Sequence, residues 1–199
     1  MNKINYQKAL EDIIADIVNT GKKKSLLLHC CCAPCASYVL TYLKDYFDIT
    51  AFYFNPNITD EIEYKKRLDE LVRLTNEFGI KVIDGGFDRD NFFIAVKGYE
   101  NAVEGGERCS VCYSLRLEET AKLCQKNGYD YFCSTLSISP LKDVDRLNKF
   151  GEEFAKKYGA THLPNDFKKK NGYLKSIELS KKYDLYRQNY CGCEFSKRD

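Results

Sequence analysis

Residues 25–35 read SLLLHCCCAPC, an apolar run that ends in one histidine and four cysteines. Three consecutive leucines are typical of a buried strand in a parallel sheet, because both faces of such a strand are covered. A helical segment is expected directly afterwards, at residues 35–44, so the thiols lie in a loop between a strand and a helix. Functional sites of open α/β sheets form at the carboxyl ends of strands. This stretch therefore predicts both the fold class and the position of the site.

The rest of the chain continues the alternation of strands and helices. Further strands are expected at residues 49–54, 80–83 and 131–134, and helices at residues 6–20, 60–79, 91–96, 109–125, 139–158 and 173–182. Strands separated by helices imply a parallel sheet with helices on both faces. We expect one catalytic domain over residues 1–199, with a helical extension at 1–24 and a ligand-bearing tail at 185–199.

Three of the expected helix ends have local signals. Gly21 can close the first helix, because glycine adopts the left-handed conformation at a helix C-terminus. Asp60, with Glu63 three residues later, is a capping pair for the helix that follows. The pair Ser139-Pro140 predicts another helix start, since serine caps free amides and proline fits the first helical position.

Composition limits the classes of protein. The 199 residues are 44% hydrophobic, which is enough for a core without disulfides, and the net charge is only +2. Short basic runs at residues 22–24, 168–170 and 197–198 could contact phosphates but are more simply solvated surface. The sequence has no apolar signal region and no run that could span a bilayer. We expect a cytoplasmic protein with no membrane partner, whose thiols stay reduced.

Seven of the ten cysteines fall in three clusters that lie far apart in the sequence. The clusters contain Cys31, Cys32 and Cys35; Cys109 and Cys112; and Cys191 and Cys193. Thiolates bind soft metals, and short-spaced groups of this kind usually close one site in space. We therefore expect the function to lie where the three clusters meet.

Three kinds of site are compatible with these cysteines. Cys32 and Cys35 alone have the spacing of a thiol-disulfide oxidoreductase, in which a helix N-terminus stabilises the thiolate. The same two with Cys109 and Cys112 could form a structural zinc site, for example in an RNA-binding module. Neither reading uses all seven cysteines. An iron-sulfur cluster with four thiolates, beside a further metal or reactive thiol, does use them and points to catalysis.

Six motifs, in order along the chain from Leu26, carry a resemblance to a known family. They read HCCCAPC at residues 29–35, FYFNPNI at 52–58, ERCSVC at 107–112, TLSISP at 135–140, DFKK at 166–169 and LYRQNYCGC at 185–193. The chain resembles the QueH family of epoxyqueuosine reductases. Three positions depart from the family pattern, Cys30, Val103 and Lys168, and none of them removes an expected ligand.

The resemblance implies an α/β fold like that of the HUP group, which includes nucleotide α-hydrolases. It implies a 4Fe-4S cluster with an adjacent mononuclear iron, whose place another divalent metal could take in vitro. The implied substrate is epoxyqueuosine at the wobble position of tRNA, bound through the anticodon stem-loop and reduced to queuosine with electrons from an external low-potential donor.

We assign the ligands within that frame. Adjacent cysteines in an extended loop point in opposite directions, so Cys31 and Cys32 are expected to serve different centres. The expected cluster ligands are Cys32, Cys109, Cys112 and Cys191, and the expected ligands of the second iron are Cys31 and Cys193. Cys35 is left as a catalytic thiol without an assigned metal.

Further residues have two possible roles each. Asp166 could be an oxygen ligand or proton donor, or else a helix cap or a lysine partner. His29 could orient a ligand or donate a proton, or else be a hydrogen-bonded histidine at a strand end. Candidate contacts to substrate, phosphate or cluster sulfide are Arg108, Arg187 and Gln188, and candidate stacking residues for an unstacked base are Tyr53, Tyr186 and Tyr190. Cys124 and Cys133 are expected in the core, and Cys30 as a buried extra thiol.

Overall fold

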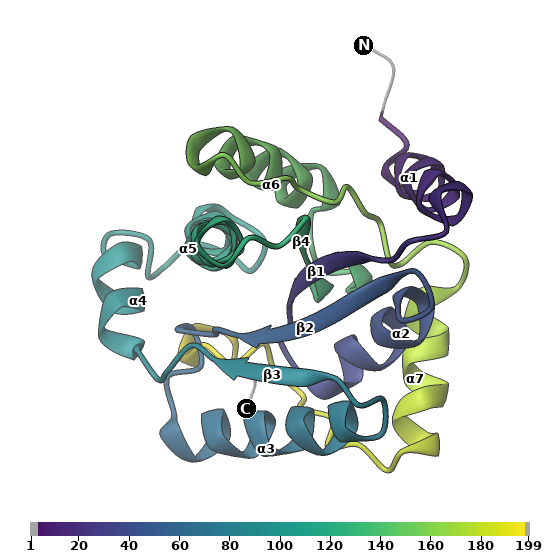
Figure 1. Cartoon of the computed structure of the whole chain (residues 1–199). Coiled ribbons are helices and arrows are strands. Elements are labelled where there is room, and N and C mark those ends of the chain that lie inside the picture. The colour runs from purple at the N-terminus through teal and green to yellow at the C-terminus, as the bar shows by residue number, and fades with distance from the viewer. Residues whose placement is uncertain (1–3, 198–199) are drawn as a thin grey trace.

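A computed structural model, which describes residues 4–197, shows one α/β domain around a four-stranded parallel sheet (Figure 1). The strands are β1 (Lys24–His29), β2 (Phe47–Tyr53), β3 (Lys81–Asp84) and β4 (Tyr131–Ser134), in the order β3-β2-β1-β4. The helices are α1 (Tyr6–Thr20), α2 (Ala33–Leu43), α3 (Glu61–Asn76), α4 (Arg89–Val96), α5 (Glu107–Asn127), α6 (Val144–Tyr158) and α7 (Gly172–Lys182), with short 3-10 helices η1 (Thr135–Ile138) and η2 (Glu194–Ser196). The predicted fold class is confirmed.

Strand β1 lies in the centre of the sheet because its side chains are apolar on both faces. Leu26 and Leu28 belong to one core cluster and Leu27 to the other, as alternate residues of a strand must. Leu28 is paired with Ala51 of β2 on one side and with Cys133 of β4 on the other. Burying both faces of this strand joins the two halves of the core.

The helices cover both faces of the sheet, as Figure 1 shows. Helices α5 and α6 pack together on one face, and α2, α3 and α7 lie on the other. The C-terminal segment, yellow in Figure 1, runs past the carboxyl end of β2. The expected N-terminal extension is part of this arrangement, because Leu10 of α1 is fully buried and Gln7 donates a hydrogen bond of 3.1 Å to the Tyr42 hydroxyl of α2.

Two of the three predicted helix ends are confirmed. Gly21 follows α1 with a φ of 65°, and Asp60 precedes α3 and accepts hydrogen bonds from the amides of Ile62 and Glu63 at 2.9 and 3.1 Å. The capping interactions thus close both helices as the local sequence predicts.

The helix start predicted at Ser139-Pro140 is wrong. Ser139 ends the 3-10 helix η1, with its amide bonded to the Leu136 carbonyl, and its ψ of 130° is the extended conformation that a residue before proline prefers. Helix α6 begins only at Val144, where the Asp143 carboxylate accepts the Arg146 amide at 3.0 Å. A residue that can cap a helix can also end a turn, and here the following proline favours the turn.

Within residues 4–197, no helix combines the length and the apolarity needed to cross a bilayer. The parts of the predicted single domain at residues 1–3 and 198–199 lie outside the described residues, and so does the second half of the basic run at 197–198.

Candidate metal centre and substrate cavity

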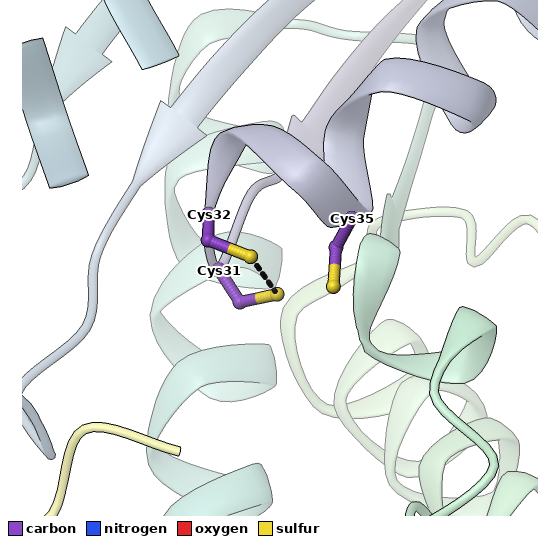
Figure 2. A group of neighbouring side chains, drawn as sticks. All are labelled: Cys31, Cys32 and Cys35. Atoms are coloured by element: carbon purple, nitrogen blue, oxygen red, sulfur yellow. Dashed lines mark hydrogen bonds between the residues drawn. The ribbon is translucent and has the colours of Figure 1, made fainter. Parts of the chain in front are cut away.

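The first cysteine cluster lies in the loop between β1 and α2. Figure 2 shows Cys31, Cys32 and Cys35 with their sulfurs turned toward one another, and the three Sγ atoms lie within 4.8 Å of one another. The Sγ atoms of Cys31 and Cys32 are 3.8 Å apart, and the Thr135 hydroxyl donates to Cys31 Sγ at 3.5 Å. All ten cysteines of the chain are free thiols. The expectation that Cys31 and Cys32 point in opposite directions is therefore wrong, and this group offers three sulfur donors to one soft metal.

The beginning of helix α2 favours a thiolate at Cys32. Cys32 is the N-cap residue, with extended backbone angles, and its carbonyl accepts the Ala36 amide at 3.0 Å. Hydrogen bonds from Cys31 and then from Cys35 hold the pKa of the Cys32 thiol well below its usual range, while the pKa of Cys35 is raised. Hence Cys32 is the member of this group that most readily binds a metal as thiolate.

The second cluster lies on the first turns of α5. Cys109 and Cys112 are three residues apart, so both face the same side of the helix, and both are nearly buried. The Gly105 amide donates a hydrogen bond to Cys109 Sγ at 3.2 Å. Burial raises the pKa of Cys112 to about 12, which makes a bare thiolate unfavourable there unless a cation compensates it.

The third cluster lies in the C-terminal segment. The ammonium group of Lys142 donates a hydrogen bond to Cys191 Sγ at 3.3 Å. Cys193 is buried beside Cys112 and Phe92, and burial raises the pKa of its thiol. Cys191 and Cys193 line one small cavity together, although only Cys191 contacts Lys142.

Two adjoining cavities bring the three clusters together. The larger, of about 280 Å³, is lined by Cys31 and Cys35 of the first cluster and by Cys191 of the third. The smaller, of about 10 Å³, is lined by Cys109 and Cys112 together with Cys191 and Cys193. Cys191 lines both cavities. In the described residues Cys193 lies with the second cluster and makes no hydrogen bond to Cys31.

Four cations line the larger cavity, Arg67, Arg116, Lys142 and Arg187, against one carboxylate, that of Glu104. The Arg116 side chain is almost fully buried and donates a hydrogen bond to the Asn57 side-chain oxygen. Burial lowers the pKa of Arg116, but the thiols of Cys112 and Cys191 raise it by more than burial lowers it. The net pKa is raised, so the guanidinium stays charged. A buried cation in this position compensates anionic sulfur on both sides.

The Arg116 guanidinium also has a free donor that could bind an anionic group between the clusters. Arg116 Nε is buried and has no hydrogen-bond partner among the described residues. A buried unpaired donor is costly, and it is expected where an absent ligand supplies the acceptor. Six of the seven clustered thiols line the two cavities, and Cys32 lies directly beside Cys31. Free thiols facing such a donor are the right donor set for a thiolate-bound iron centre with sulfide acceptors.

His29 is placed beside the first cluster but is held on both ring nitrogens. Nδ1 lies 2.8 Å from the Ser134 hydroxyl, and Nε2 lies 3.0 Å from the Phe54 carbonyl, which can only accept. Burial, followed by the charge of Arg116, lowers its pKa to about 4. These are the contacts of a neutral hydrogen-bonded histidine at a strand end, the second of its two expected roles.

Asp166 is buried and lies close to a lysine. Its Oδ1 atom has no hydrogen bond but lies 3.5 Å from Lys168 Nζ, which in turn donates to the Lys142 carbonyl at 3.5 Å. This is the lysine partnership expected from the sequence as one of its roles. Through Lys168, Asp166 is also connected to the backbone of Lys142, and the ammonium group of Lys142 contacts Cys191.

Of the three polar candidates, two line the larger cavity. Arg187 lies there and donates to the Ser180 hydroxyl at 3.0 Å, and Gln188 lies there with a hydrogen bond that helps to lower the pKa of Cys32. Arg108 instead binds the backbone carbonyls of residues 99, 100 and 102, at 3.3, 2.7 and 2.5 Å. It therefore fastens the excursion between α4 and α5, and it also lines the smaller cavity.

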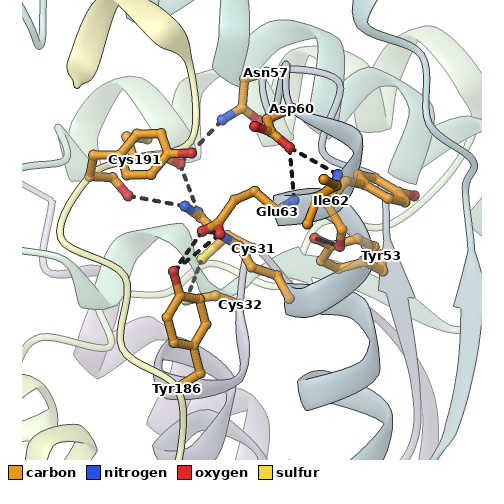
Figure 3. A network of polar contacts seen from close by, with 12 residues as sticks. Cys31, Cys32, Tyr53, Asn57, Asp60, Ile62, Glu63, Tyr186 and Cys191 are labelled. Atoms are coloured by element: carbon orange, nitrogen blue, oxygen red, sulfur yellow. Dashed lines mark hydrogen bonds and ion pairs between the residues drawn. The ribbon is translucent and has the colours of Figure 1, made fainter.

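The three candidate stacking residues are placed differently. Tyr53 is fully buried and donates to the Tyr64 carbonyl at 3.1 Å, so the expectation that it stacks on a substrate base is wrong. Tyr190 lines the larger cavity, and the Arg67 guanidinium lies 5.1 Å from its ring centre. Tyr186 donates to the Glu63 carboxylate at 3.1 Å, as Figure 3 shows. Tyr190 alone is both at the cavity and able to face a base.

The remaining cysteines are core residues, as predicted. Cys30 and Cys133 belong to one core cluster, Cys124 belongs to the other, and all three are fully buried. None of them lines either cavity among the described residues.

Sequence reasoning missed the buried cations of the site. Arg116 follows Cys112 by four residues on α5 and so shares its helix face, a signal that could have been used. Arg67 similarly follows Glu63 by four residues on α3. Lys142 has no comparable signal, because only the tertiary fold brings the turn after η1 to Cys191.

The chain is similar to known proteins of one family. A family model described as epoxyqueuosine reductase QueH matches residues 26–199. The epoxyqueuosine reductase QueH of Staphylococcus epidermidis is 39% identical over 202 residues, which cover 98% of this chain and 85% of the relative. Its counterpart from Haemophilus influenzae is 40% identical over 176 residues, covering 87% of this chain and 72% of the relative. The match thus includes all three cysteine clusters.

A solved structure shares the fold. The U34-tRNA thiolase NcsA from Methanococcus maripaludis, solved with its 4Fe-4S cluster, superposes with a TM-score of 0.55 over 98% of this chain and 74% of the thiolase. The two sequences are 13% identical, so the likeness concerns the fold alone. It agrees with the α/β fold expected from the sequence.

Proposed function

The chain belongs to the QueH family of epoxyqueuosine reductases, and on this premise we propose that its three cysteine clusters hold the metal centre that reduces epoxyqueuosine in tRNA to queuosine. Family membership makes the protein an oxidoreductase of the last step of queuosine biosynthesis. One observation carries the proposal for its site. Thiols of all three clusters line two adjoining cavities, with Cys191 common to both.

The reaction is a two-electron deoxygenation. Both carbon–oxygen bonds of the epoxide break, a carbon–carbon double bond forms, and the oxygen leaves as water after taking up two protons and two electrons. An external low-potential donor supplies the electrons, so the protein must hold a redox centre and admit a proton donor to the epoxide oxygen.

The thiols fit a 4Fe-4S cluster with an adjacent mononuclear iron. When bound, such a centre supplies single-electron transfer and a Lewis acid for the epoxide oxygen. In the sequence-based division, Cys32, Cys109, Cys112 and Cys191 hold the cluster, and Cys31 and Cys193 hold the iron. The smaller cavity supports a second division, in which Cys193 joins Cys109, Cys112 and Cys191 on the cluster.

Serine variants distinguish the two divisions. In the first division, Cys193→Ser leaves much of the cluster absorbance and abolishes turnover. In the second, the same variant bleaches the cluster as strongly as Cys109→Ser does. Cys31→Ser is expected to leave much of the absorbance in either case, and bleaching by this variant would contradict both divisions.

The protein side chains have defined tasks around this centre. Lys142 compensates the charge of Cys191, and Arg116 compensates the charge of Cys112 and Cys191 from within the core. Arg187, Gln188 and Tyr190 line the larger cavity, whose volume suits one extruded nucleobase with its substituent. These residues orient the substrate and exclude water from the reacting bond.

Proton delivery has two candidates. Asp166 lies near the site through its contact with Lys168, and Cys35 lines the larger cavity beside Cys31. Cys35 is half-buried and its pKa is raised by hydrogen bonds with Cys31 and Cys32, so it remains a protonated thiol at neutral pH. A protonated thiol at the cavity wall can give its proton to an oxygen that is leaving.

The partner is tRNA, and its anticodon stem-loop presents the substrate base. Single-stranded loops are recognised through unstacked bases held against aromatic or guanidinium planes, which Tyr190 and Arg67 together provide at the cavity. Ten free cysteines are compatible with a reducing compartment, and we place the reaction in the cytoplasm.

Two rival functions use parts of the same site. A thiol-disulfide oxidoreductase would use Cys32, whose lowered pKa favours attack, with Cys35 as its partner. A structural-zinc module would use the thiols without turnover. Anaerobic purification followed by iron, zinc and acid-labile sulfide analysis separates the three readings.

The function itself is tested with tRNA that carries epoxyqueuosine. The reconstituted protein is incubated anaerobically with this tRNA and dithionite, and the nucleosides are then analysed. We expect queuosine. A colourless, metal-free protein that reduces disulfides would support the first rival and contradict the proposal.

A further inference from the structure

The C-terminal segment that carries Cys191 and Cys193 forms no regular element between the end of α7 and η2. Such segments stay in place only if side chains from elsewhere tie down their backbone. Here the ties come from α3 and from the loop after β2. Three of them bind the carbonyls of residues 190 and 191, directly at the first thiol of the segment.

Arg67 of α3 makes most of these contacts. Its guanidinium donates to the Cys191 carbonyl at 3.2 Å and to the Tyr190 carbonyl at 3.4 Å, and Nε donates to the Glu63 carboxylate at 2.7 Å. Asn57 adds a second donor to the Cys191 carbonyl at 3.3 Å. Figure 3 shows the labelled members of this network converging on the segment around Cys191.

The fit around Gly192 is equally close. Its φ of 117° lies in the region that favours glycine, and a Cβ atom there would come within 2.8 Å of Ile58 and 3.2 Å of the Arg67 guanidinium. The backbone of the segment therefore rests directly against the groups that bind it. A small change in the position of Arg67 would be passed on to Cys191.

Arg67 itself is built into the fold rather than laid on its surface. Its side chain is 2% exposed, and Glu63 is held in turn by the Tyr186 hydroxyl at 3.1 Å. A desolvated guanidinium is stable only when its donors are satisfied, and here two of the acceptors are carbonyls of the C-terminal segment. Docking of the segment and burial of Arg67 thus depend on each other.

We propose that Arg67 is a positioning residue of the metal centre, which holds the backbone of Cys191 so that this thiol faces both cavities. The inference rests on the proposed function, because it takes Cys191 as a metal ligand. Arg67 acts through the carbonyls of Tyr190 and Cys191 and not through a bond to the metal. Without it the carbonyls of Tyr190 and Cys191 keep, within residues 4–197, only the hydrogen bond from Asn57, while α3 and the sheet remain.

Arg73 provides a matched control. It also belongs to α3, pairs with Glu70 at 2.8 Å, and donates to carbonyls of the C-terminal region, those of Tyr183 and Asp184, at 2.9 and 3.0 Å. The nearer of these two carbonyls, that of Asp184, lies seven residues before Cys191 in the sequence. The two arginines thus have the same donors on the same helix, but they bind different parts of the segment, and the Arg73 side chain is 46% exposed.

The test measures thiol accessibility in the metal-free protein. Cys191 and Cys35 are both half-buried cysteines of the larger cavity, so their rates of alkylation by iodoacetamide can be compared within one molecule. In Arg67→Met we expect Cys191 to react roughly tenfold faster, because its backbone loses the Arg67 donor. The rate of Cys35 is expected to change less, since Cys35 belongs to α2 and the segment forms only part of its cavity. Arg73→Met is expected to change neither rate.

Two results would overturn the proposal. One is an unchanged alkylation rate of Cys191 in folded Arg67→Met. The other is an equal rise in Arg73→Met. If Arg67→Met does not fold, Arg67→Lys replaces it, since lysine keeps the charge but cannot reach two carbonyls and Glu63 together. An unchanged Cys191 rate in that variant overturns the proposal equally.

Iron uptake separates this proposal from the proposed function. After anaerobic reconstitution we expect Arg67→Met to hold less than half the iron of the wild type, and Arg73→Met to hold the wild-type amount. If the wild type takes up no iron, the proposed function fails, whereas the alkylation rates still decide whether Arg67 holds Cys191.

Discussion

Lys142 Nζ lies 3.3 Å from Cys191 Sγ, and this ammonium group is itself almost buried. Burial lowers the pKa of Lys142, but its interactions, chiefly with the Cys191 sulfur, raise the pKa by more. The net pKa therefore lies above the usual range of lysine. The ammonium stays charged across the neutral range. It supplies a fixed positive charge to a thiol that lines both cavities.

Removing that charge is expected to weaken the metal centre. In Lys142→Met, the loss of a hydrogen bond to a charged group corresponds to about 1.5–3 kcal/mol, or roughly a tenfold to hundredfold weaker interaction. We expect lower iron content and a more negative reduction potential, because a nearby positive charge favours the reduced, more negative state of the centre. Lys142→Arg keeps the charge and serves as the control. A wild-type potential in Lys142→Met would contradict this role.

Cys112 and Cys124 test which thiols belong to the site. Both lie on α5 and both are buried, but only Cys112 lines a cavity. Cys112→Ser is expected to lose most of the absorbance of the reconstituted protein, and Cys124→Ser to retain it with a loss of stability of about 1 kcal/mol. Absorbance spectra and iron analysis of the two variants check this. Equal bleaching would mean that general destabilisation causes the loss.

Gly192→Ala should disturb the site through the backbone. Alanine at a φ of 117° costs on the order of 1–3 kcal/mol, and its Cβ would press on Ile58. We expect reduced iron uptake without unfolding of the domain. Gly98→Ala is the control, because Gly98 also has a positive φ, of 88°, but has open space around its Cβ position. A similar loss of iron uptake in both variants would sink the explanation.

His162 predicts a dependence of stability on pH. Burial lowers its pKa to about 3, whereas histidine in an unfolded chain titrates near pH 6.5. The unfolded state therefore binds the extra proton first, and the stabilising contribution is complete above pH 6.5 and is lost as the pH falls toward 3. Between pH 7 and 5 the loss is about 2 kcal/mol. Urea unfolding of the metal-free protein at several pH values measures it.

A variant isolates the contribution of this histidine. His162→Gln should be less stable than the wild type at pH 7 but should lose less free energy of unfolding between pH 7 and 5. Identical pH slopes for the two proteins would show that His162 is not the group responsible.

The elements were predictable where local sequence and burial agree. The strand at residues 131–134 and the helix at 6–20 have their predicted bounds. The strand is marked by its buried apolar run, and the helix by its apolar pattern together with its capping residues. Ser139-Pro140 was misread because its signals suit a turn as well as a helix start. The order of the strands is set by contacts between distant segments, which no local pattern contains.

The site was predictable in its thiols but not in its cations. Three short-spaced groups of cysteine are visible in the sequence itself and indicate metal chemistry. Arg116 and Lys142 act through burial beside those thiols, and lysine and arginine are mostly surface residues in any sequence. Tyr53 was predicted to stack on a base because it lies in a functional motif, but an aromatic residue of such a motif can also belong to the core.

Conversion of epoxyqueuosine tRNA under limiting reductant tests the central claim most directly. The iron-loaded protein is given known amounts of dithionite electrons, and queuosine is quantified in the tRNA beside Cys112→Ser and Cys124→Ser. The account predicts one queuosine for every two electrons with the wild type and Cys124→Ser, and almost none with Cys112→Ser. Absence of queuosine from a wild-type protein with its full iron and sulfide content would contradict it.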